Sequence, residues 1–161
     1  MTPPLEDIKN LYSAGRYDDA LRIIRGAEKE CFASPALLVW KARCLLLTDN
    51  PTGTMDDVQR SLEQALKVDN EYLAALVDLA YFHLNVMDNP QAALPMFRRA
   101  LSLFTQIATE TIVGLGEAIS ETDSSESALE FLESNADIKI DASKLQELTM
   151  ELKSAKIKSS E

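Results

Sequence analysis

The chain contains few of the side chains that catalysis usually requires. His83 is its only histidine. Without a second histidine, a suitable cysteine partner or a glycine-rich nucleophile turn, nucleophilic chemistry has no set of residues to use. The segment Gly114-Leu115-Gly116 is not typical of a phosphate-binding loop, because no strand pattern precedes it and no Lys-Ser/Thr pair follows it. We therefore expect a protein that is not an enzyme and interpret His83 as a partly buried structural residue.

Metal and redox chemistry also lack a sequence pattern. The Asp and Asn residues at Asp49-Asn50 and Asp88-Asn89 do not follow the alternating spacing of a calcium loop that ends in Glu. Cys31 and Cys44 lack the paired spacing of a zinc site or redox motif. Two buried thiols are favoured over a disulfide, because free cysteine packs as a small hydrophobe. We expect no metal and no cofactor.

Composition and charge narrow the class of protein further. The 161 residues include only five Gly and six Pro, which favours an all-α fold, and the net charge is −10. This charge argues against nucleic acid and anionic membranes as partners, because binding those requires concentrated Lys and Arg. A basic partner is allowed, although a solvated surface is the favoured explanation of the acidity. The absence of a membrane-span or signal pattern predicts a cytoplasmic protein.

A pair of apolar residues recurs along the chain at near-constant intervals. In each copy a small or β-branched residue is followed four positions later by a large apolar one, which places both on one helix face. The pairs are Ala20 and Ile24, Val58 and Leu62, Ala93 and Phe97, and Ala128 and Leu132, at offsets of 38, 35 and 35 residues. Such periods indicate repeated helix pairs.

The repeat predicts eight helices in antiparallel pairs and a ninth near the C-terminus. The expected ranges are 4–14 with 17–31, 35–48 with 55–68, 71–86 with 90–104, 108–121 with 124–135, and finally 142–157. Ser34 before Pro35, the segment 123–126, and Asp141 are candidate helix starts. Residues 49–55 predict a longer turn, and Pro95 should kink its helix.

The motifs Gly15-Arg16-Tyr17-Asp18-Asp19-Ala20 and Ala65 to Ala80 resemble the tetratricopeptide repeat family. The resemblance covers roughly residues 5 to 135 in four degenerate copies. It implies a right-handed α-solenoid of about four helix hairpins over residues 1–140, followed by a capping helix over 141–157 and a frayed tail over 158–161. The ninth helix has Leu145, Leu148, Leu152 and Ala155 on one stripe, so it either caps the last repeat or fills the binding groove.

The resemblance also implies a concave groove lined by the first helix of each pair. Aligned copies place three columns of residues there: Leu5, Val39, Val77 and Val113; Lys9, Arg43, Tyr81 and Glu117; and Tyr12, Leu46, Leu84 and Ser120. Tyr12, Arg43 and Tyr81 are the candidate anchors, because Tyr and Arg often carry binding energy at interfaces. As an alternative, some of these residues pack between neighbouring pairs, and Trp40 takes the core position in the second copy.

From these residues we expect a non-enzymatic adaptor that binds a partner peptide or helix with apolar anchors in its groove. The Lys, Arg and Asn clamp by which some family members hold acidic chaperone tails is absent, since Val39, Trp40, Ala74, Val77 and Asp78 stand at those positions. One alternative is a bacterial chaperone or immunity-type protein that masks a secreted effector or toxin. Another is a self-associating scaffold, with a homodimer formed through an exposed apolar flank.

Overall fold

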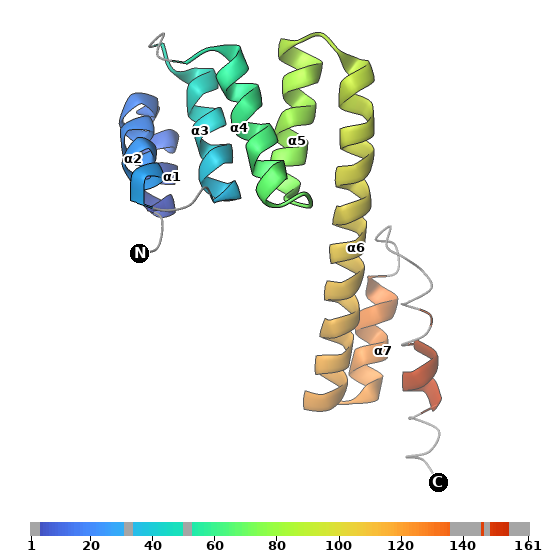
Figure 1. Cartoon of the computed structure of the whole chain (residues 1–161). Coiled ribbons are helices and arrows are strands. Elements are labelled where there is room, and N and C mark those ends of the chain that lie inside the picture. Colours follow the sequence, from blue (N-terminus) through green and yellow to red (C-terminus); the bar gives the residue numbers. More distant parts are fainter. Residues whose placement is uncertain (1–3, 31–33, 50–52, 136–145, 147–148, 155–161) are drawn as a thin grey trace. The chain divides into compact units, whose positions relative to one another are not determined.

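The computed structural model describes residues 4–30, 34–49, 53–135, 146 and 149–154, and their regular structure is entirely helical (Figure 1). The helices are α1 (Leu5–Ser13), α2 (Tyr17–Glu30), α3 (Pro35–Leu47), α4 (Met55–Val68), α5 (Leu73–Tyr81), the π-helix η1 (Phe82–Val86), α6 (Pro90–Thr122) and α7 (Ser125–Ser134). Residues 149–154 are also helical. The predicted all-α class is confirmed.

The chain divides into two compact units, residues 1–100 and 101–161. The division falls inside α6, so the first part of this helix belongs to unit 1 and the remainder to unit 2. It also falls within the predicted repeat domain 1–140. Among the described residues, no helix is long and apolar enough to cross a membrane.

The turn between α1 and α2 depends on Gly15. Its φ of +71° is in the left-handed region that glycine adopts without strain. The N–H of Gly15 donates to the Tyr12 carbonyl at 3.0 Å, and the N–H of Arg16 donates to the Leu11 carbonyl at 2.9 Å. These two bonds form a Schellman motif, which satisfies the last carbonyls of α1 and turns the chain into α2.

The helices α4 and α7 begin at side chains that cap them. The Thr54 hydroxyl accepts from the Asp57 N–H at 3.2 Å, while the Asp57 carboxylate accepts from the Thr54 N–H at 2.9 Å, giving α4 a reciprocal capping box. Ser124 caps α7 by accepting from the Ser127 N–H at 3.1 Å. This position agrees with the predicted helix start at 123–126. Ser34 occupies the N-cap position of α3, but its side chain makes no capping bond. The predicted start at Asp141 lies outside the described residues.

The predicted break between helices 90–104 and 108–121 is wrong, because α6 runs without interruption from Pro90 to Thr122. The intervening Thr105-Gln106-Ile107 contains no Gly, Pro, Asn or Asp, the residues that mark the chain's other turns. The Thr105 hydroxyl donates to the Leu101 carbonyl at 2.9 Å, so its polar group is satisfied within the helix. The helix also continues through Pro95.

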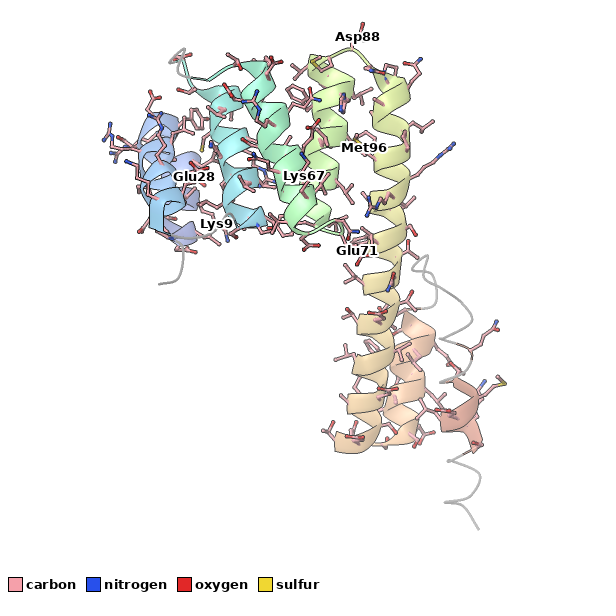
Figure 2. All side chains as sticks on the ribbon, in the orientation of Figure 1. Lys9, Glu28, Lys67, Glu71, Asp88 and Met96 are labelled. Atoms are coloured by element: carbon pink, nitrogen blue, oxygen red, sulfur yellow. The ribbon has the colours of Figure 1, made fainter. Side chains whose placement is uncertain are left out.

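Unit 1 has a core in two clusters. One joins Leu38, Val39 and Ala42 of α3 to residues of α4, α5 and η1, with Met96 of α6 packed against it (Figure 2). The other joins α1, α2 and the opposite side of α3, where Leu37 and Cys44 are buried. Because α3 is apolar nearly all round, it contributes to both clusters and lies at the centre of unit 1.

Unit 2 has a smaller core. Its buried members are Ile112 of α6, Ala128, Leu129 and Leu132 of α7, and Leu152. The helical residues 149–154 therefore cover part of this core, as a capping helix would. Leu145, Leu148 and Ala155 of the predicted stripe lie outside the described residues.

Candidate functional site

A hollow of about 320 Å³ opens on unit 1 where α1, α3, α5 and η1 meet. It is lined by Tyr12, Arg43, Leu46, Leu47, Asp78, Tyr81, Phe82, Asn85 and Val86. These residues come from the helices that the repeat pattern places first in each pair. The first helices converge because α1 contacts α3, and α3 contacts α5.

Arg43 and Asp78 form the polar centre of the hollow. The Arg43 Nε lies 2.6 Å from Asp78 Oδ2, and a second guanidinium nitrogen lies 3.1 Å from Oδ1. The guanidinium also stacks over the Trp40 ring, 4.9 Å from its centroid. The hydrogen bond with Asp78 is the main cause that raises the pKa of Arg43 above its ordinary value. Arg43 is therefore held charged and in one orientation.

Aromatic side chains form two walls of the site. Tyr12 packs edge-on against Trp40 with ring centroids 5.2 Å apart, and Tyr81 packs edge-on against Phe97 at 5.0 Å. Burial is the main cause that raises the pKa of Tyr12, so its hydroxyl stays neutral at physiological pH. Tyr81 is 52% exposed and presents much of its ring to solvent.

An apolar rim borders the polar centre, and we define it as Leu46, Leu47, Tyr81 and Val86. All four are exposed and all four line the hollow. The π-helix contributes to the rim, because the N–H of Met87 donates to the Phe82 carbonyl five residues earlier at 3.1 Å. This wider turn brings both Asn85 and Val86 to the hollow. Single-turn π-helices often occur at functional sites.

The turn after η1 is also constrained. Asp88 has a φ of 48° and lies between η1 and α6 (Figure 2). The Asn89 N–H donates to the His83 carbonyl at 2.8 Å, and the Asn89 side chain accepts from the Ala92 N–H at 3.1 Å. These bonds close η1 and start α6, so the π-helical turn is held at both ends.

The structure brings together Tyr12, Arg43 and Tyr81, the three predicted groove residues that we named as anchors, and it adds Leu46 from the third column. The role of these four residues in binding stays a prediction. Val39 does not join them. It is only 2% exposed and belongs to the core, because α3 is enclosed by helices on both sides.

The other predicted positions do not line the hollow. Leu5 is half-buried against the core cluster of α1 and α2, Lys9 is exposed on α1, and Val77 is half-buried on α5. Leu84 is exposed on η1.

Three further predicted groove residues belong to unit 2. Val113 packs against the core of that unit, Glu117 is exposed on α6, and Ser120 is half-buried on α6. All three lie beyond the part of α6 that belongs to unit 1, so none contributes to the hollow.

The sequence interpretation missed Leu47, Asp78, Phe82, Asn85 and Val86 as lining residues. Asp78 had a weak signal in the sequence, because it carries the charge opposite to that of Arg43 and follows it by 35 residues, close to the repeat offsets of 35 to 38. Asn85 and Val86 had no such signal in the sequence, since their placement depends on the π-helical turn.

A larger hollow of about 460 Å³ lies between α2, α3 and α4. Its cations are largely matched by neighbouring carboxylates: Lys41 pairs with Glu28 at 2.7 Å, and Arg60 pairs with Asp57 at 2.9 Å. We therefore consider this hollow a weaker candidate for binding a partner than the hollow with the apolar rim.

The described His and Cys residues considered for chemistry are half-buried or buried. His83 is half-buried, and its Nδ1 has no hydrogen-bond partner among the described residues. Cys44 is a buried free thiol whose pKa burial raises to about 11, whereas Cys31 lies outside the described residues. No group of His, Cys, Asp and Glu in the described ranges is arranged to hold a metal ion.

Comparison of the chain with protein-family models, with curated proteins and with solved structures found no match. Its function is therefore inferred from the geometry of the hollow.

Proposed function

We propose that this protein is a non-enzymatic adaptor that holds a segment of a partner protein in the hollow of unit 1. The observation that carries the proposal is the combination in one hollow of an exposed apolar rim with a fixed polar centre. Tyr is among the residue types that most often anchor partners, and the aliphatic residues beside Tyr81 add apolar contact area.

The chemistry of the lining indicates the kind of segment it would take. An aliphatic or aromatic side chain of the partner would contact Tyr81, Leu46 and Val86. The Asn85 amide would offer hydrogen bonds to the partner's backbone, since an amide both donates and accepts. Arg43 would form a side of the binding site that does not move, because Asp78 and Trp40 already hold its guanidinium.

We also propose that the hairpins of unit 1 are tetratricopeptide-like repeats within an α-solenoid. The successive contacts of α1 with α3 and of α3 with α5 support this, because first helices lie next to one another in such arrays. Figure 1 shows α3, α4 and α5 side by side in chain order. The third and fourth predicted pairs share one continuous helix, α6, so they are not separate hairpins.

The proposal is tested by quantitative affinity capture with the full chain and two variants of the rim, Tyr81→Ala and Leu46→Asp. We expect one set of captured proteins to fall about tenfold or more with both variants, because loss of a central anchor costs on the order of 2 kcal/mol. Val68→Asp is the matched control, since Val68 is 55% exposed on α4 and does not line the hollow. If both rim variants retain every protein that the control retains, the hollow is not the binding site.

A further inference from the structure

Unit 2 exposes an apolar face on its part of α6. Leu101, Phe104 and Ile107 are each more than half exposed, and Leu115 is exposed farther along the helix. A different side of the same helix is covered, because Ile112 is buried against α7. The exposed face is therefore additional to the apolar surface that unit 2 needs for its own core.

The spacing of this face is that of a helix-packing seam. Its positions are three or four residues apart and all are exposed, and we define them as the α6 seam: Leu101, Phe104, Ile107, Thr111, Leu115 and Ala118. An apolar repeat averaging about 3.5 residues keeps one stripe facing a second helix over several turns. The occupant that fits the seam is consequently an α-helix with its own apolar stripe.

The charge of this region selects among possible helices. Residues 101–135 contain no Lys, Arg or His, and they contain the carboxylates Glu110, Glu117, Glu121, Asp123, Glu126, Glu130 and Glu133. Glu117 and Glu121 are exposed on α6 itself. A second copy of the chain would bring two such acidic surfaces together, which like-charge repulsion disfavours. A cationic helix would be attracted to the same surface.

We propose that the α6 seam binds an amphipathic helix of a partner protein whose apolar stripe is bordered by Lys and Arg. The partner's apolar side chains pack on Phe104 and Leu115, and its cations lie beside the exposed carboxylates of α6. This site is separate from the hollow of unit 1 and does not depend on the function proposed for it.

A peptide of defined composition tests the proposal. The probe is a helical peptide with Leu at alternating spacings of three and four residues and Lys at the remaining positions, labelled for fluorescence anisotropy. Its matched control carries Glu in place of each Lys. We expect the Lys peptide to bind the full chain at least about tenfold more tightly than the Glu peptide, with an affinity that falls as salt is raised.

Variants distinguish seam binding from general attraction to an acidic protein. Phe104→Asp and Leu115→Asp are each expected to weaken the Lys peptide about tenfold or more, because each removes an apolar contact within the seam. Met150→Asp adds the same charge to unit 2 at a residue that is 66% exposed and outside α6, and it should change the Kd less than about twofold. A purely electrostatic contact would be strengthened by any added carboxylate. Phe104→Ser repeats the test without added charge, and circular dichroism checks that each variant stays helical.

Three outcomes would overturn the proposal. The first is equal binding of the Lys and Glu peptides, and the second is a Phe104→Asp variant that binds the Lys peptide as tightly as Met150→Asp does. The third is a wild-type dimer, measured by light scattering, that Phe104→Asp converts to a monomer, since the occupant would then be a second copy.

Discussion

The two units use apolar helices in different ways. In unit 1, α3 is surrounded by α1, α2, α4 and α5, and it buries Leu37, Leu38, Val39, Ala42 and Cys44. In unit 2, the later part of α6 buries Ile112 but leaves Phe104 and Leu115 exposed. The difference shows that the apolar content of a helix does not determine its burial, which depends on how many neighbours the fold supplies.

Polar interactions differ between the units as well. Unit 1 contains the ion pairs Arg43–Asp78, Lys41–Glu28 and Arg60–Asp57. In unit 2, the sequence has no cation from residue 101 to residue 135, and the carboxylates of this segment are exposed. Ion pairs therefore recur within unit 1, whereas residues 101–135 of unit 2 carry exposed carboxylates and no cation of their own.

The largest expected effect concerns the core of unit 1. Phe82 is 2% exposed, and Phe82→Ala should lower the free energy of unfolding by about 3–5 kcal/mol, because it removes a large buried side chain and leaves a cavity. Phe104→Ala in unit 2 should cost less than about 1 kcal/mol, since that ring is exposed. Urea denaturation measures both, and equal losses would contradict the difference in burial.

A second test addresses the smaller core. Leu132 is 2% exposed, and Leu132→Ala should destabilise unit 2 by about 2–4 kcal/mol. Hydrogen exchange should then show faster exchange in residues 101–135 while α3 keeps its protection, because units with separate cores open separately. Met150→Ala is the control, as its side chain is exposed. Equal loss of protection in α3 would show that the two units unfold together.

The ion pair of the hollow should contribute less. Asp78→Asn leaves the half-buried Arg43 without its charged partner, so we expect a loss of about 1–2 kcal/mol. The emission of Trp40, the only tryptophan, should shift because Arg43 stacks on its ring. Arg60→Gln breaks an exposed pair and should leave both stability and emission nearly unchanged. Unchanged emission in Asp78→Asn would mean that Asp78 does not position Arg43.

The smallest effect is a pH dependence confined to unit 1. Hydrogen bonds from the Thr54 N–H and hydroxyl lower the pKa of Asp57 below its ordinary value. A lowered folded-state pKa gives stability that is present above the unfolded value and lost as pH falls through the folded one. The α4 start should therefore weaken in acid below about pH 4.

The helix α7 provides the comparison for this pH effect. It is capped by the Ser124 hydroxyl, which does not titrate, so its start should lack this particular acid dependence. An NMR titration of the Asp57 carboxyl carbon measures the effect directly. Thr54→Ala removes the hydroxyl but keeps the backbone N–H, so it should return the Asp57 pKa only part of the way toward its ordinary value. A titration that is the same in wild type and variant would exclude the Thr54 hydroxyl as a cause.

Much of the fold was accessible from local sequence signals. The ranges of α2, α3, α4 and α7 match their predictions within a few residues, because Gly15, Pro35 and Ser124 act on the backbone beside them. The continuity of α6 was missed, because the repeat interval predicted a turn where residues 105–107 have no turn-forming type. The local chemistry of those three residues was the better guide.

The site was only partly accessible from sequence. Repeat alignment placed Tyr12, Arg43 and Tyr81 in neighbouring columns, and all three line the hollow. The same alignment placed Val39 beside them, because it cannot distinguish an exposed position from one covered by a neighbouring helix.

The sequence by itself determined that this chain is helical, where several of its helices begin and end, and that residues 101–135 are acidic without cations. Those properties depend on backbone preferences and charges that belong to each residue and its near neighbours. The tertiary structure alone decided that Val39 lies in the core, that η1 brings Asn85 and Val86 to the hollow, and that the α6 seam is exposed. These properties arise from contacts between helices distant in the sequence, whose distances and packing no local pattern specifies.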